Sequence, residues 1–96
     1  MFLLEYDLVA DYLERRSEFR EDHLALATEA AQRGELVLGG ALADPADRAI
    51  LVWRVADQGI VDEFVRADPY VINGLVRSWS IRSWTVVIGT AARPLA

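Results

Sequence analysis

Residues 12–33, YLERRSEFREDHLALATEAAQR, form the stretch that decides the fold, and they predict one long helix from Tyr12 to Arg33. At about 100° per residue, its apolar side chains fall on one arc, and the only histidine of the chain, His23, lies near the middle of that arc. The apolar members of the arc are Leu13, Phe19, Leu24, Leu26, Ala27, Ala30 and Ala31. Arg20 and Arg16 lie on the same arc, one and two turns before His23. Because an imidazole and two guanidiniums that point inward are costly unless they find partners or a cavity, plain core packing does not explain them.

Both ends of this helix carry recognisable signals. Asp11, followed three residues later by Glu14, predicts a capping box at the start. Gly34 predicts a left-handed residue directly after the last turn. The helix is therefore expected to end where the sequence turns toward the next strand.

Composition limits the classes of protein that this chain can be. With 96 residues, it is expected to form a single domain over residues 1–96. A hydrophobic content of 53% and a net charge of −5 argue against a nucleic-acid partner and against disorder. The absence of cysteine excludes disulfides and cysteine nucleophiles, and with one histidine it makes a metal site unexpected. No apolar run approaches the roughly 20 residues that span a membrane, so we expect no membrane partner and a cytoplasmic location.

Four segments have the alternating pattern of strands. Phe2–Val9 comes first, Leu36–Leu42 and Ala49–Val55 are expected to pair as a hairpin, and Arg77–Ile88 comes last. The segment Asp44–Asp47 predicts the turn of the hairpin.

A second helix is expected between the third and fourth strands. Asp57 can cap it, and its buried stripe consists of Ile60, Val61, Phe64 and Val65. It must stop before Pro69, and Asp68 can then cap a short further turn. Asn73-Gly74 can end that turn, and the tail 91–96 is expected to fray.

The resulting order β-α-β-β-α-β predicts an α+β, ferredoxin-like fold with both helices on one face of a four-stranded antiparallel sheet. Strands one, three and four carry apolar residues on both faces, so the uncovered face requires a lid. A second copy of the same sheet is the simplest lid, and we therefore predict a homodimer that closes into a dimeric α/β barrel.

A combination of short motifs resembles a known family. Its members here are Arg16, Arg20, His23-Leu24, Gly34, Gly40, Ala67-Asp68-Pro69-Tyr70-Val71 and Gly74. Together they resemble the YciI-like (YCII-related) family over about Phe2 to Trp84. The resemblance implies a ferredoxin-like fold, dimerisation, and a pocket in which His23 and Asp68 form a catalytic pair. It also implies a shared architecture with muconolactone isomerases and cofactor-free monooxygenases, although shared architecture does not transfer chemistry.

The chain departs from that family pattern at three places. Glu21 stands where proline is frequent, Gly40-Ala41 stands where Gly-Pro is frequent, and the second hairpin is shorter. The last two border the expected pocket, so they leave the identity of the substrate open.

The site residues predict acid–base chemistry without metal or organic cofactor. If Asp68 accepts from one ring nitrogen of His23, the other nitrogen is left to take or give a proton. Arg16 and Arg20 can hold a small anionic or aromatic substrate, with Gly40, Tyr70 and Trp79 completing the binding wall. This combination suits proton abstraction beside a carbonyl, as in muconolactone isomerases, or elimination such as dehydrohalogenation of a hydroxylated aromatic.

Other interpretations stay open at this point. The same pocket suits a non-catalytic, ligand-binding dimeric module, and the polar cluster suits a structural dimer. Capping alone explains Asp68, and Arg16 and Arg20 can instead pair with Glu5 or Asp7.

Overall fold

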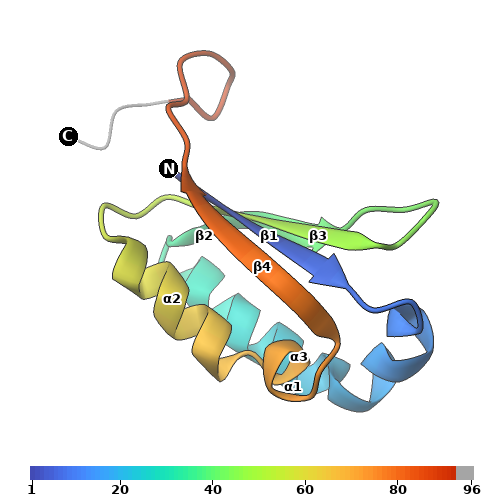
Figure 1. The fold of residues 1–96 in the computed structure, drawn as a ribbon. Helices are drawn as coiled ribbons and strands as arrows, with labels where there is room; N and C mark the ends of the chain where they lie inside the picture. Colours follow the sequence, from blue (N-terminus) through green and yellow to red (C-terminus); the bar gives the residue numbers. More distant parts are fainter. Residues whose placement is uncertain (93–96) are drawn as a thin grey trace.

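The computed structural model describes residues 1–92, and its elements follow the predicted order with a short third helix before the last strand (Figure 1). They are β1 (Phe2–Leu8), α1 (Tyr12–Gln32), β2 (Leu36–Ala41), β3 (Arg48–Trp53), α2 (Gln58–Ala67), α3 (Pro69–Ile72) and β4 (Val76–Ser83). The βαββαβ, ferredoxin-like prediction is confirmed.

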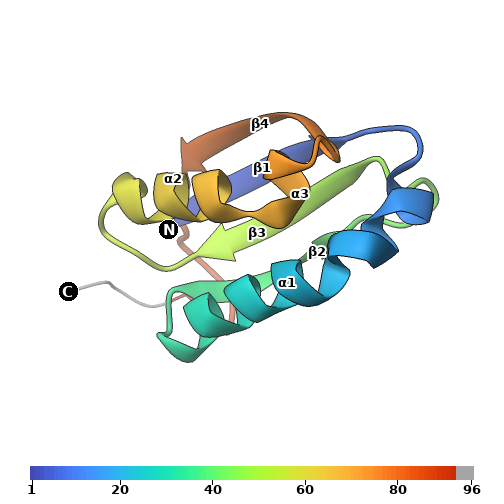
Figure 2. The same ribbon diagram turned by 90° about the horizontal axis from the view of Figure 1, so that it is seen from below.

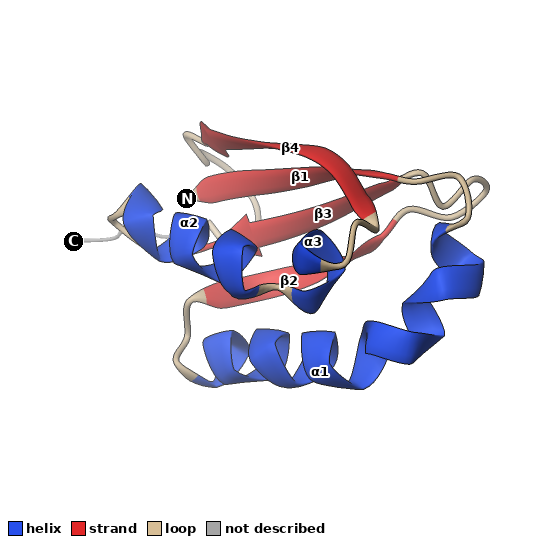
Figure 3. Cartoon of the chain, turned by 60° about the horizontal axis from the view of Figure 1, so that its bottom comes forward, coloured by secondary structure: helices blue, strands red, loops and turns tan. Residues whose placement is uncertain are grey.

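The four strands form one antiparallel sheet in the order β2-β3-β1-β4. The first strand is central, and Leu4 lies opposite Leu51 of β3 on one side and Ile81 of β4 on the other. All three helices lie on the same face, with α1 beneath the β2 side and α2 and α3 beneath the β1 and β4 side (Figures 2 and 3). Within residues 1–92, no helix is long and apolar enough to cross a membrane.

The core lies between this sheet and the helices. Leu4, Tyr6 and Leu8 alternate toward the helices and are buried, as the period of two predicts. Trp53 of β3 and Val61 of α2 are fully buried with them. The hydroxyl of Tyr6 is thereby carried into an apolar interior, where it requires a partner.

The long helix α1 is less buried than its apolar arc predicts. Tyr12 and Ala30 are buried, but the side chains of Leu13 and Leu24 are 54% and 44% exposed. The prediction of a continuous buried arc is therefore wrong at these positions. Part of the arc faces hollows instead of packed side chains, since Leu24 borders a cavity under the middle of the helix and Leu13 borders a wider groove near its start.

The predicted helix caps at Gly34, Asp57 and Asp68 are confirmed. Gly34 has φ +78°, and Asp57 accepts a hydrogen bond from the Gly59 amide at 2.9 Å. Asp68 accepts one from the Tyr70 amide at 3.0 Å. The capping box at Asp11 is wrong, because its side chain caps no amide and lies 3.9 Å from Arg15 Nη1. The Tyr12 amide is satisfied by the carbonyl of Val9 at 3.1 Å instead.

The last strand is shorter than the predicted Arg77–Ile88. Its pairing ends where the amide of Trp84 donates to the carbonyl of Met1 at 2.8 Å. Because β1 starts at Phe2, the chain beyond Trp84 has no strand left to pair with. Arg54 then holds the carbonyl of Ala91 at 2.7 Å, and residues 93–96 of the predicted frayed tail lie outside the described residues.

The face of the sheet opposite the helices carries both apolar and charged side chains. By strand alternation Leu3, Ile50 and Leu38 point to this open face, and Leu38 is 62% exposed. Glu5 and Arg48 form an ion pair there at 2.6 Å. No helix among residues 1–92 covers this face (Figure 3).

Candidate functional site

A cavity of about 200 Å³ lies between α1, α3 and the sheet. The long helix contributes Arg16, Arg20 and His23 to its wall, and α3 contributes Tyr70. Strand β2 contributes the floor beside Gly39 and Gly40. Thus five of the seven predicted site residues (Arg16, Arg20, His23, Gly40 and Tyr70) line one hollow.

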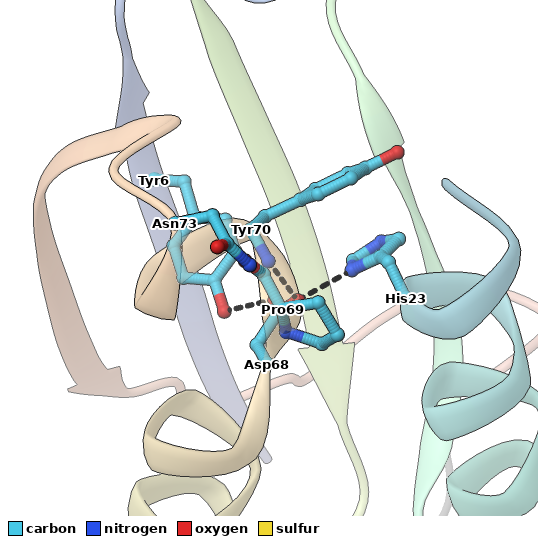
Figure 4. A network of polar contacts seen from close by, with 6 residues as sticks. All are labelled: Tyr6, His23, Asp68, Pro69, Tyr70 and Asn73. Atoms are coloured by element: carbon cyan, nitrogen blue, oxygen red, sulfur yellow. Dashed lines mark hydrogen bonds and ion pairs between the residues drawn. The ribbon is translucent and has the colours of Figure 1, made fainter. Parts of the chain in front are cut away.

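His23 and Asp68 meet at the wall of this cavity. His23 Nδ1 lies 2.7 Å from Asp68 Oδ1, the imidazole is 14% exposed and the carboxylate is fully buried (Figure 4). Because a carboxylate only accepts hydrogen bonds, Nδ1 carries the proton and donates it. Among residues 1–92, no hydrogen bond engages Nε2, so this nitrogen is left to act on a ligand.

Asp68 caps α3 and binds His23 at the same time. The Tyr70 amide donates to Oδ1 at 3.0 Å, and the Tyr6 hydroxyl donates to Oδ2 at 2.7 Å. The capping function and the contact with His23 are therefore not alternatives. Three donors also compensate the loss of water around this buried carboxylate.

A second contact joins the two segments that carry the pair. Arg15, one residue before Arg16, donates from Nη2 to the carbonyl of Asn73 at 2.9 Å and from Nη1 to that of Gly74 at 3.4 Å. These bonds join α1 to the turn that directly follows α3, so they help to fix the distance between His23 and Asp68.

The imidazole is also held by aromatic contacts. The ring of Tyr70 stacks on it, with centroids 3.8 Å apart and an interplanar angle of 9°. Phe64 approaches at 6.5 Å, edge on. Together with the hydrogen bond to Asp68, these contacts hold the imidazole of His23 in one orientation.

The cavity is cationic. Arg16 lies 5.6 Å from the centre of the Tyr12 ring, and neither Arg16 nor Arg20 forms an ion pair within residues 1–92. Glu5, one of the two acids considered as partners, pairs with Arg48 instead. Burial raises the pKa of Tyr70 above its ordinary value of 10.0, Tyr12 and Asp68 add to the rise, and Arg20 and Arg16 oppose it. The Tyr70 hydroxyl therefore keeps its proton at neutral pH.

Two predicted wall residues are placed differently from the others. Trp79 lies opposite Tyr6 on β4, is half-exposed, and is not part of the cavity lining. Gly40 borders the cavity, but a side chain would enter it from Gly39, where an added Cβ would lie 3.1 Å from Leu51 Cγ. A register shift between Leu36 and Leu38 turns Gly39 toward the helices, which the uninterrupted alternation of the sequence did not reveal.

Sequence reasoning missed the two residues that support the pair, Tyr6 and Arg15. The burial of Tyr6 was predictable from strand alternation, but its partner was not, because 62 residues separate the two. Within residues 1–92, no three histidine, cysteine or acidic side chains lie close enough together to hold a metal ion.

Comparison with known proteins shows the family to which the chain belongs. A solved structure with a similar fold is 5-chloro-2-hydroxyhydroquinone dehydrochlorinase from Burkholderia phenoliruptrix, in complex with 2,5-dihydroxybenzoquinone. It superposes with a TM-score of 0.74 at 20% identity, over 88% of this chain and 92% of that one. No curated protein matches the chain. The family model of the YCII-related domain matches residues 1–85, and the chain therefore belongs to the YCII-related family.

Proposed function

We propose that the protein is a small-molecule enzyme of lyase or isomerase type in which His23 is the acid–base residue. The observation that carries this proposal is the 2.7 Å contact between the fully buried carboxylate of Asp68 and an imidazole at the wall of a cavity. Asp68 fixes the tautomer and stabilises the imidazolium, so that Nε2 can accept a proton from a ligand.

In an elimination, Nε2 of His23 takes a proton from the substrate. The electron pair of the broken bond forms a new double bond, and the halide leaves with the pair of its own bond to carbon. The substrate loses one proton and one halide ion without oxidation or reduction, and His23 then releases its proton to solvent. In an isomerisation, the same nitrogen returns the proton to another carbon of the substrate.

The cavity favours a small, anionic substrate with one ring. A cavity of about 150 Å³ is known to hold benzene, so about 200 Å³ accommodates a ring with small substituents. Arg16 and Arg20 suit the oxygen of a phenolate or carboxylate, and they also suit an enolate oxygen, on which charge grows as the proton leaves. The dehydrochlorinase of similar fold holds a molecule of this kind, 2,5-dihydroxybenzoquinone.

We further propose that the functional unit is a homodimer built on the open face of the sheet. Leu38 is exposed there, beside Leu3 and Ile50 from the neighbouring strands. A second copy presents the same apolar strip and the same Glu5–Arg48 pairs, which a twofold axis can match.

The test is a screen of halogenated hydroquinones and small lactones with wild type, His23→Ala and Glu29→Gln. Halide release and lactone absorbance report turnover, and calorimetry reports binding. We expect turnover in wild type and in the control variant on the exposed side of α1, with a loss of at least about 100-fold in His23→Ala. Binding without turnover in all three proteins points instead to a ligand-binding module, and equal turnover in all three refutes the role of His23.

A further inference from the structure

Tyr6 is a buried polar residue to which the proposed reaction gives no part. It lies in the middle of β1 with its side chain 1% exposed. Its hydroxyl donates to Asp68 Oδ2 at 2.7 Å, from the side of the carboxylate that faces away from His23 (Figure 4). Such a donor on the central strand is fixed more firmly than one on a loop.

The two oxygens of Asp68 have separate sets of donors. Oδ1 accepts from His23 and from the Tyr70 amide, and within residues 1–92 Oδ2 accepts from Tyr6 alone. Without the hydroxyl of Tyr6, a buried charged oxygen is left without a donor, which is costly. The Tyr6 bond therefore fixes the plane of the carboxylate and the oxygen that it presents to the imidazole.

We propose that Tyr6 is a positioning residue for His23, acting through Asp68. By donating to Oδ2, Tyr6 keeps the charge of the carboxylate shared between its two oxygens and keeps Oδ1 aligned with Nδ1. The effect of Tyr6 on turnover rests on the proposed function. Its effect on the protonation of the His23 imidazole does not.

The hydroxyl of Tyr6 can donate over the whole neutral range. Burial raises its pKa far above the ordinary value of 10.0, and the charge of Asp68 and the hydrogen bond to it add to the rise. The other groups near His23 and Asp68 are the ring and amide of Tyr70 and, on the same helix as His23, the guanidiniums of Arg16 and Arg20 in the cavity wall. All of these are retained when Tyr6 is replaced by phenylalanine.

Because His23 is the only histidine, selective ¹⁵N labelling of histidine gives a single imidazole to follow by NMR. In wild type we expect the neutral ring to carry its proton on Nδ1. In Tyr6→Phe, the Asp68 carboxylate has one hydrogen-bond donor fewer and therefore holds the proton that it shares with His23 more tightly. We expect the His23–Asp68 pair to become protonated at a pH about one unit higher than in wild type. Tyr12→Phe is the matched control, because it removes the hydroxyl of another tyrosine that lines the same cavity, and this hydroxyl makes no hydrogen bond to Asp68. Identical titrations of wild type and Tyr6→Phe overturn the proposal.

Two further measurements separate the positioning role of Tyr6 from a folding defect and from the proposed reaction. If Tyr6→Phe does not fold, the wild-type spectrum decides: a slowly exchanging Tyr6 hydroxyl proton that shifts in Asp68→Asn supports the proposal, and its absence refutes it. If a substrate is found, Tyr6→Phe is expected to lower kcat about tenfold with little change in KM. A shifted titration without turnover in any variant leaves Tyr6 as a positioning residue and refutes the proposed reaction alone.

Discussion

Asp68 accepts a hydrogen bond from His23 at 2.7 Å across 45 residues of sequence, while the amide of Tyr70 donates to the same oxygen. The start of α3 therefore positions the proposed catalytic carboxylate. An Asp-Pro pair is an ordinary way to begin a helix, since aspartate caps and proline suits the first turn. Here the fold uses that local preference to place a charged oxygen beneath an imidazole on another helix.

Replacing Asp68 by Asn is expected to lower activity by about 10²- to 10⁴-fold, because an amide neither stabilises the imidazolium nor fixes the same tautomer. Asp57→Asn is the matched control, since Asp57 also caps a helix, whereas only Asp68 makes a hydrogen bond with His23. Steady-state kinetics and thermal unfolding should be measured for both variants. A similar loss of activity in the two would assign the effect to capping.

Replacing Arg16 or Arg20 by Gln is expected to raise KM by about tenfold each, because each removes a charge-assisted contact with an anionic substrate. Arg66→Gln is the control, since it makes the same change in net charge on the exposed side of α2. An effect on KM that is equal in all three variants would indicate long-range attraction alone. A selective effect that vanishes with a neutral substrate analogue supports direct contact.

Gly39→Ala is expected to weaken binding of a ring-shaped ligand by more than Gly40→Ala. The added methyl group of Gly39→Ala would lie 3.1 Å from Leu51 Cγ at the cavity floor, whereas that of Gly40→Ala meets nothing within 4 Å. Calorimetric titration with 2,5-dihydroxybenzoquinone provides the measurement. If Gly40→Ala has the larger effect, the assignment of Gly39 to the cavity side is wrong.

Much of this architecture was predictable from local pattern. Alternation in Phe2–Leu8 and the signals at Gly34, Asp57 and Asp68 depend on neighbouring residues, so the order of elements and most of their ends were confirmed. The exposure of Leu13 and Leu24 was not predictable, because burial depends on whether the helix packs against other side chains or borders a cavity at that position. The register shift in β2 and the Tyr6–Asp68 bond depend on tertiary contacts that no local pattern encodes.

The open face of the sheet predicts concentration-dependent dimerisation. Leu38→Glu introduces a charge into its exposed apolar strip and should shift the protein toward monomer. Ile72→Glu is the control, because Ile72 is equally exposed but lies on the helical side, in α3. Light scattering coupled to gel filtration distinguishes the outcomes. A wild-type protein that is monomeric at high micromolar concentration contradicts the dimer.

Alkaline pH should destabilise the protein in part through Tyr6. The folded chain raises the pKa of Tyr6 above the 10.0 of an unfolded tyrosine, so above pH 10 the unfolded chain loses a proton that the folded chain retains. The unfolded state then binds fewer protons, and the free energy of unfolding falls by about 1.4 kcal/mol per pH unit for this group. Below pH 10 the Tyr6 contribution is fully present.

Tyr6→Phe should therefore be less stable than wild type at pH 8, and the difference in free energy of unfolding between the two proteins should narrow between pH 10 and 11. Val61→Ala, which loses only buried packing, should stay parallel to wild type over the same range. Urea unfolding at several pH values measures this, and a difference between wild type and Tyr6→Phe that stays constant up to pH 11 would show that Tyr6 titrates normally in the folded protein.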